Sequence, residues 1–251
     1  MVFKTIKKYL LLLLLFITVS CQVTETIRFN PDGSGSIEVV NLREENSYMQ
    51  LAKEEYSKEN IYKDTTYVFG DYIKKHQETF SRISVVDQKI FLKYSEVIVH
   101  RKASSYEKEF RTTYTQNFKK ASDIVDLYKT DHYLDDIKNN YALSAEEHYY
   151  KVSYIFEGNH FNRKVSIVDS LEQKKQLDVI ENMKAEHKGF KLVQSYVLSY
   201  HFPRKIQSVS NPQAKISEDR KSLSVQFLLT DCLQNPESTN LEVVLEPEVV
   251  D

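Results

Sequence analysis

The segment KLVQSYVLSYHF, residues 191–202, has the clearest strand pattern in the chain. Apolar or aromatic side chains alternate with polar ones, and residues that alternate in this way lie on opposite faces of a β-strand. One face carries Leu192, Tyr196, Leu198, Tyr200 and Phe202. The other carries Lys191, Ser195, Ser199 and His201, and Pro203 ends the strand. The segment therefore predicts a sheet with one buried and one polar face.

Further strands are predicted on both sides of this segment. Alternation recurs at 223–229 and 241–245, and 64–69 is expected to be extended. Hairpins are predicted around turns at 30–35, 102–108 and 158–159. Helical spacing is found at 47–56, 71–82, 84–94, 119–129 and 170–183. Hairpins with helices between them favour an α+β fold with a mostly antiparallel sheet and helices packed on it.

Two shorter segments carry local signals. Ser84 followed by Asp87 has the spacing of a capping box and predicts a helix start. Residues 130–146 are acidic, with His132 near their start and His148 just after their end, which raises the alternative of a metal site. Their spacing matches no ligand pattern, so we expect a solvated loop and a candidate subdomain boundary.

The N-terminus has the pattern of a secretory signal. Lys4, Lys7 and Lys8 precede an apolar run at 10–17, and small Ser20 precedes Cys21. The run is too short to span a bilayer as a stable helix. We therefore predict a signal peptide over residues 1–20 and one mature domain over residues 21–251.

A signal that ends in a cysteine resembles a bacterial lipoprotein signal. Val19, Ser20 and Cys21 fit the lipobox, whereas Thr18 departs from the usual aliphatic residue. The resemblance implies cleavage before Cys21, lipid chains such as palmitate on that residue, and anchoring to the cell-envelope membrane. Two or more acyl chains give stable attachment. Gln22 and the lack of an acidic run after Cys21 imply the periplasmic face of the outer membrane. The alternative is a secreted protein with a chance cysteine.

Composition narrows the function further. The formal charge is −2, and loss of the three signal lysines leaves about −5, so nucleic-acid binding is not expected. Cys232 has no partner once Cys21 is acylated, so we expect a small buried residue that stays reduced. The chain has no nucleophile elbow, zinc motif or phosphate-binding glycine loop, and its seven histidines are scattered. We therefore predict no catalytic, cofactor-binding or metal-ligating residue and no enzymatic activity.

Two stretches together suggest a family. Residues 26–30 and 32–35 follow Cys21, and residues 202–206 precede 217–223 near the C-terminus. This arrangement resembles a functionally uncharacterised group of Bacteroidota envelope lipoproteins and, more distantly, the LppM-like lipoprotein domain. The resemblance implies a curved antiparallel sheet packed with helices, and binding of a lipid or another apolar ligand. It implies no catalytic residue.

Three functions follow as hypotheses. The first is a lipid-anchored binding or scaffold protein, the second a lipid-anchored hydrolase without a recognisable motif, and the third a structural subunit of a surface assembly that pairs through an open edge strand. The helix with Leu177, Ile180 and Met183 is the expected cover of the apolar strand faces. If it is held off the sheet, it leaves an apolar pocket; if it packs tightly, the same residues are core. The residues of this predicted pocket are Tyr196, Leu198, Tyr200, Phe202 and Phe227.

Overall fold

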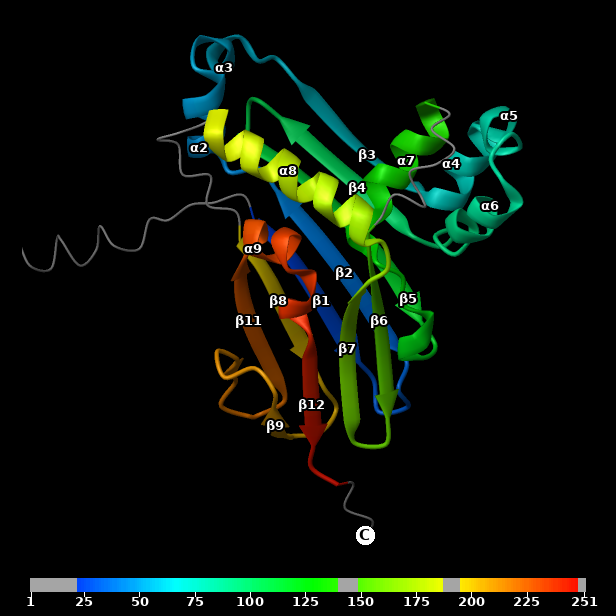
Figure 1. The fold of residues 1–251 in the computed structure, drawn as a ribbon, viewed down its shortest axis with the longest axis vertical. Helices are drawn as coiled ribbons and strands as arrows, with labels where there is room; N and C mark the ends of the chain where they lie inside the picture. Colours follow the sequence, from blue (N-terminus) through cyan, green and yellow to red (C-terminus); the bar gives the residue numbers. More distant parts are fainter. Residues whose placement is uncertain (1–21, 140–148, 187–194, 248–251) are drawn as a thin grey trace, which may run out of the picture.

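The computed structural model describes residues 22–139, 149–186 and 195–247. These residues form two β-sheets that pack face to face, with most of the helices gathered at one end of the larger sheet (Figure 1). The predicted α+β class with mostly antiparallel sheets is confirmed, and the larger sheet is not closed into a barrel. Cys21 and the signal segment lie outside the described residues, as do residues 191–194 of the strand with the clearest pattern.

The larger sheet has eight strands in the order β10-β11-β8-β1-β2-β5-β4-β3. Their bounds are β1 Gln22–Phe29, β2 Gly35–Leu42, β3 Tyr62–Val68, β4 Ile98–Ser104, β5 Glu109–Phe118, β8 Ser195–His201, β10 Lys215–Ile216 and β11 Ser222–Leu228. All neighbours are antiparallel except β1 and β8, which run parallel with Gln22 opposite Ser195. The first described strand therefore lies in the interior of the sheet, bonded on both sides.

The smaller sheet has four strands in the order β6-β7-β12-β9. Their bounds are β6 Tyr150–Glu157, β7 His160–Ile167, β9 Ile206–Val209 and β12 Leu241–Leu245. β6 and β7 form a hairpin, and β12 pairs antiparallel with both β7 and β9. The chain reaches β9 directly after β8, so Pro203 marks the point where it passes from one sheet to the other.

Turn chemistry explains the first hairpin. Gly33 has φ +83°, a conformation that glycine adopts without strain, and Asp32 Oδ1 accepts a hydrogen bond from the Ser34 amide at 3.0 Å. A Cβ at Gly35 would lie 2.0 Å from the Arg28 carbonyl oxygen, so no other residue fits there without a shift. All three predicted hairpins are confirmed.

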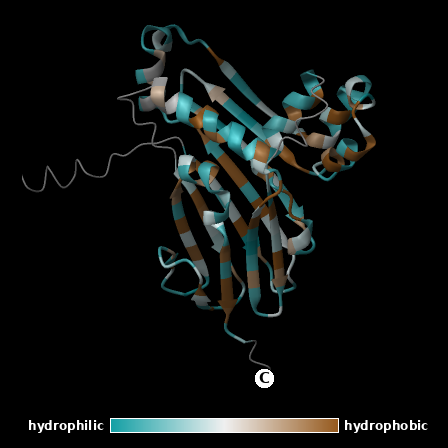
Figure 2. Ribbon diagram, viewed as in Figure 1, coloured by the Kyte–Doolittle hydropathy of each residue, from teal (hydrophilic) through white to brown (hydrophobic). Residues whose placement is uncertain are grey.

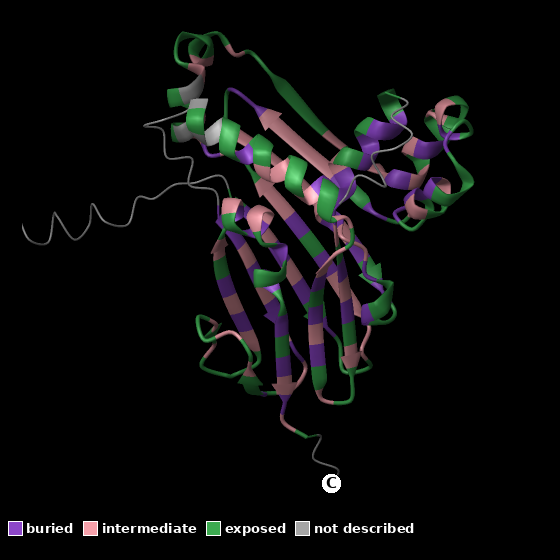
Figure 3. Cartoon of the chain, in the orientation of Figure 1, coloured by how far each residue is buried: buried purple, intermediate pink, exposed green. Residues whose placement is uncertain are grey.

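The core lies between the two sheets. Figure 3 shows buried residues alternating with exposed or half-buried ones along the strands, and Figure 2 shows apolar bands in the same places. The inward faces carry, for example, Ile27 and Leu198 from the larger sheet and Phe161 and Val243 from the smaller one, each at most 1% exposed. Two sheets that each bury one face against the other explain the period of two along these strands.

Six short helices lie near the end of the larger sheet that the smaller sheet does not cover (Figure 1). They are α2 Glu45–Ala52, α3 Glu54–Lys58, α4 Phe69–Lys75, α5 Gln77–Phe80, α6 Val85–Leu92 and α7 Thr130–Asn139. Tyr133 of α7 makes edge-on ring contacts with Phe91 at 5.1 Å and Tyr94 at 4.9 Å. The predicted capping box is confirmed, because the Ser84 hydroxyl accepts from the Asp87 amide at the start of α6.

Two predictions about helices are wrong, and a third is confirmed with one interruption. Residues 119–129 form two 3₁₀ turns, η2 Ala121–Asp123 and η3 Leu127–Lys129, instead of one helix. The expected loop begins as the helix α7, which buries Tyr133, Leu134 and Ile137; residues 140–148 are outside the described part. The segment 71–82 is divided between α4 and α5, which His76 separates. The predicted subdomain boundary in this region stays a prediction.

The cover of the β8 and β11 faces differs from the expectation. The remaining helices are α8 Ser170–Glu186 and α9 Leu229–Gln234, followed by the 3₁₀ turn η4 Pro236–Thr239. The long helix α8 is largely hydrophilic and crosses the helical end of the molecule (Figures 1 and 2). The smaller sheet lies against β8 instead, with the rings of Phe161 and Tyr200 5.3 Å apart. The prediction that the helix with Leu177 and Ile180 covers this face is therefore wrong.

The packing of Leu198 yields a first prediction. Leu198 is fully buried, whereas its neighbour Val197 on the opposite face is half-buried. Because the interior is close-packed, we expect Leu198→Trp to lower the free energy of unfolding by at least about 1–3 kcal/mol. Urea unfolding measures this, and Val197→Trp, on the open face, is the matched control with a smaller loss. A Leu198→Trp variant as stable as the control would show spare space at this position.

Candidate functional site

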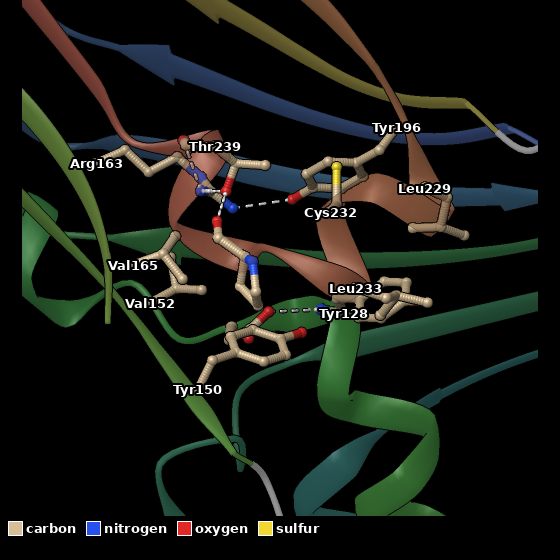
Figure 4. A pocket seen from close by; sticks show the side chains of 12 residues that line it. Tyr128, Tyr150, Val152, Arg163, Val165, Tyr196, Leu229, Cys232, Leu233 and Thr239 are labelled. Carbon is tan, nitrogen blue, oxygen red and sulfur yellow. Dashed lines mark hydrogen bonds between the residues drawn. The ribbon is translucent and has the colours of Figure 1, made fainter. Parts of the chain in front are cut away.

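A small cavity lies between the sheets beside α9 (Figure 4). Its volume is about 30 Å³, and its polar lining comes from Asp126, Tyr128, Tyr150, Arg163, Tyr196 and Thr239. A water molecule needs roughly 10–15 Å³ of such volume, whereas drug-sized ligands occupy roughly 300–1,000 Å³. The cavity can therefore take one or two waters but no organic ligand of ordinary size.

A buried ion pair connects this cavity to the centre of the molecule. Arg163 of β7 donates from Nε to Glu25 Oε1 of β1 at 3.3 Å, and both side chains are 3% exposed. Arg163 also donates from Nη1 to Thr239 Oγ1 at 2.7 Å and from Nη2 to Tyr196 Oη at 3.1 Å. The guanidinium thus contacts the larger sheet and η4 at the same time.

Three tyrosine hydroxyls complete the coordination of Glu25. Tyr196 donates to Oε2 at 2.6 Å, while Tyr200 and Tyr154 donate to Oε1 at 2.5 Å and 3.1 Å. Tyr196 and Tyr200 come from β8 and Tyr154 from β6, so both sheets contribute. Each carboxylate oxygen has partners, as a buried charge requires.

Burial and pairing set the charge states in this cluster. Burial alone would raise the pKa of Glu25, but the Arg163 charge and the hydrogen bonds from Tyr196 and Tyr200 outweigh it, so the pKa lies below its ordinary value. Burial, together with the Glu25 charge, raises the pKa of Tyr196 and Tyr200 well above the usual value. Glu25 is therefore ionised and the tyrosines are neutral donors at physiological pH.

A second buried pair, Asp126 and Lys129, lies close by. Burial raises the pKa of Asp126 and lowers that of Lys129, and the two charges are 3.9 Å apart. Lys129 donates to the Tyr150 carbonyl oxygen at 2.6 Å. Asp126 Oδ2 is buried without a protein hydrogen-bond partner, and Asp126 lines the cavity. A water in the cavity would satisfy this oxygen.

Cys232 of α9 also lines the cavity, but its thiol is not activated as a nucleophile. The thiol is 9% exposed, and burial raises its pKa to about 12. A thiol with this pKa is protonated at neutral pH and is a poor nucleophile. The prediction that Cys232 is a small buried residue is confirmed, and it lies in the short helix that directly follows β11.

The five residues of the predicted apolar pocket are brought together but packed. Tyr196 alone lines the cavity. Leu198 and Tyr200 are fully buried, and Phe202 stacks on Phe29 with ring centroids 5.7 Å apart. Phe227 lies opposite Tyr196 on the neighbouring strand β11 and is partly buried. Binding of an apolar ligand by these residues stays a prediction.

A larger hollow lies where β1 begins and β2 ends. It has a volume of about 540 Å³, and its lining residues include Arg43, Lys63, Arg101, Lys102 and Arg111. The strand register places Lys102 and Arg111 on the opposite face of the sheet from Lys63 and Arg101. Gln22, Leu42 and Phe110 also line it. We call it the basic groove. No aspartate or glutamate is among its described lining residues.

A third hollow, of about 560 Å³, lies at the opposite end of β1. We call it the distal groove; its charged lining residues are Asp32, Arg204, Lys205, Lys221 and Glu246. It therefore mixes both signs of charge. No histidine lines any of the three hollows among the described residues.

The acidic segment considered for metal binding is used in other ways. Asp131 pairs with Arg101, and Asp136 is buried within α7. Within residues 22–139, 149–186 and 195–247, no three His, Cys, Asp or Glu side chains gather as a metal site would require. His148 lies outside these residues.

Sequence reasoning missed the buried ion pair and the basic groove. Glu25 occupies an inward position between Val23 and Ile27, and Arg163 stands likewise between Phe161 and Val165. A charge within an apolar strand face signals a buried partner, because an isolated buried charge is too costly. The groove had no such signal, since its lining residues come from several strands that meet only in the folded sheet.

Comparisons with known proteins add little. No family model matches the chain, and no curated protein matches it. Among solved structures, the folded domain of LppM from Mycobacterium tuberculosis, determined by NMR, is similar over 91% of each chain, with 10% identity and a TM-score of 0.36. A likeness this weak transfers neither fold nor function, and the resemblance to Bacteroidota lipoproteins stays a prediction. Among the described helices, none has the length and apolar character needed to cross a membrane.

The Glu25–Arg163 pair gives the second prediction. Arg163→Met leaves a buried carboxylate without its cation, which costs about 3–5 kcal/mol in the free energy of unfolding. Arg28→Met, an exposed arginine on the same strand as Glu25, is the control and should change it by less than about 0.5 kcal/mol. Adding Glu25→Leu to Arg163→Met should recover much of the loss, because no unpaired charge then remains. Equal urea midpoints for Arg163→Met and Arg28→Met would contradict this account.

Proposed function

We propose that the chain is a lipid-anchored lipoprotein of the cell envelope that acts as a binding or scaffold protein. The observation that carries the proposal is the junction at residues 21–22. The signal pattern ends at Cys21, and the strand β1 begins with Gln22. A lipid on Cys21 would therefore be attached directly to an interior strand of the large sheet, without a linker.

The surface near this junction supports the proposal. Leu42, at the end of β2 and directly opposite Gln22, is 42% exposed. An apolar side chain of this kind is suited to the interface between membrane and water. An anchor at Cys21 would hold this end of the sheet toward the bilayer.

The location follows from the same proposal. Gln22 after the lipidated cysteine, without a following acidic run, favours the periplasmic face of the outer membrane by resemblance to bacterial lipoproteins. A binding or scaffold role is preferred to a catalytic one because the Arg163 and Tyr196 side chains at the cavity are engaged in structural bonds and the Cys232 thiol is protonated.

A structural subunit of a surface assembly is the second candidate. β3 is at the edge of the large sheet and pairs only with β4 within the described residues (Figure 1). An edge strand of seven residues offers unpaired backbone groups to an added strand. Lys63 and Asp64 place charges on this edge, a feature that limits nonspecific pairing.

Lipidation is tested by metabolic labelling. We expect radiolabelled palmitate to be incorporated into the wild-type chain and not into Cys21→Ala, because only Cys21 follows the signal. Cys232→Ala is the matched control and should label normally. Equal labelling of Cys21→Ala and the wild type would overturn the proposal.

Edge pairing is tested by placing a photo-crosslinking amino acid at Thr66 of β3 in living cells. Thr24 of β1 is the control, since the strand register places it in the same row on an interior strand. If the chain is an assembly subunit, Thr66 should give a cross-linked product of one defined mass and Thr24 should not. The same products from both sites, or none from Thr66, would reject the edge as the contact.

A further inference from the structure

We propose that the solvent-facing side of the helix α6 rests on the surface of an anionic lipid bilayer. The inference adds a membrane contact in the body of the protein to the proposed lipid anchor, and it rests on the proposed function for the presence of a membrane. The side chains of α6 themselves select the occupant.

The inward side of α6 ties the helix to the protein. α6 spans Val85–Leu92 and lies on the outer side of the six short helices (Figure 1). Its inward side carries Asp87 and Phe91, which are at most 1% exposed. The ring of Phe91 is 6.3 Å from that of Phe80 and 5.1 Å from that of Tyr133. The helix is therefore fixed on the protein by this side, and its other side is turned to solvent.

The outward side of α6 is apolar where a surface helix is normally polar. Val85, Val86 and Leu92 are 68%, 64% and 50% exposed. Val85 and Leu92 are seven residues apart, which is about two turns, so they lie in one line with Val86 beside them. Single exposed aliphatic residues are ordinary, but three on one side of a helix of eight residues form a patch that suits a partner.

Two lysines share this side with the aliphatic residues. Lys89 lies one turn after Val85, and Lys93, the C-cap residue, lies two turns after Val86. Both lysines are exposed, and neither forms an ion pair with another described residue. Asp87, the acid within α6, is on the buried side. The outward side therefore carries positive charge and no negative charge.

The neighbouring helices do not cancel this charge. The acids of α4 and α5 are paired with bases at 2.9 Å and 2.5 Å, in the pairs Asp71–Lys74 and Glu78–Arg82. The exposed Lys75 of α4 and Glu96, which follows α6, offset each other in number. The charges of Lys89 and Lys93 are left without a counterpart in this part of the chain.

A surface that is both basic and aliphatic suits an anionic bilayer. Aliphatic side chains enter the boundary between headgroups and acyl chains, while lysines keep their charged ends among the phosphates. Each lysine beside an anionic surface raises the affinity by about fivefold. Such a contact is weak and reversible, but a body held at the membrane by an anchor meets it at a high effective concentration.

The test uses the mature protein in vesicles and a single tryptophan reporter, because the chain contains no tryptophan. Leu92→Trp is the reporter, and Ile216→Trp, at 44% exposure on the opposite edge of the large sheet, is the matched control. In vesicles with phosphatidylglycerol, we expect brominated lipids to quench the first at least about threefold more strongly than the second. If Leu92→Trp lowers the urea midpoint, the more exposed Val86→Trp replaces it.

Charge variants in the reporter background test the two lysines. Lys89→Gln/Lys93→Gln should lower the ratio of membrane-bound to free α6, read from the quenching, by about fivefold for each lysine removed. Lys205→Gln/Lys221→Gln removes the same charge from the distal groove and should change this ratio by less than about twofold. An equal effect of the two double variants would overturn the proposal.

Vesicle flotation of the wild type and Cys21→Ala reports the anchor separately. Equal flotation of these two proteins overturns the anchor, while the quenching still decides the contact of α6. Flotation of the wild type with equal quenching of the two reporters overturns the contact and leaves the anchor standing.

Two further outcomes overturn the proposal. The first is equal quenching of Leu92→Trp in vesicles with phosphatidylglycerol and in phosphatidylcholine alone, because charge then has no part in the contact. The second assigns this side of α6 to a protein partner. It is a single protein adduct of defined mass from a photo-crosslinking amino acid at Leu92 in living cells, while vesicles leave Leu92→Trp unquenched.

Discussion

The buried contact between Glu25 and Arg163 is the constraint on which the two-sheet architecture depends. Glu25 belongs to the larger sheet and Arg163 to the smaller one, and three tyrosines and Thr239 occupy the remaining hydrogen-bonding positions. A buried ion pair adds little net stability compared with apolar residues, but a mismatched one is costly. A shift of one residue in either strand would turn one of the charges to the opposite face of its sheet. The pair therefore restricts how the sheets can be aligned.

The parallel pairing of β1 with β8 places that constraint at the centre of the molecule. Because β1 is bonded to β2 on one side and β8 on the other, Glu25 lies between the inward rows of both neighbours. Tyr196 and Tyr200 flank the position opposite Glu25 on β8, which is occupied by Leu198. The two hydroxyls thus reach the carboxylate from adjacent inward positions on one strand. The aromatic row that defines the strand pattern in the sequence is also the donor set for the buried charge.

Much of the fold could be predicted from the sequence, because local signals decide it. Alternation identified β8, β11 and β12, turn residues identified three hairpins, and Ser84 identified the start of α6. The α7 helix was missed because Tyr133, Leu134 and Ile137 are spread among acidic residues that suggested a solvated loop. The cover of β8 was wrong for a different reason. A period of two shows that one face of a strand is buried, but not whether a helix or a second sheet buries it.

The sites were less predictable than the fold, and the reason is geometric. Glu25 and Arg163 are 138 residues apart, and the lining of the basic groove is assembled only when β3, β4 and β5 pair. No sequence window contains either arrangement. The predicted lipidation signal, by contrast, is read from one contiguous stretch, and it stays a prediction because Cys21 lies outside the described residues. Local signals therefore decide which segments become strands, whereas the order of the strands in the sheets decides which side chains meet.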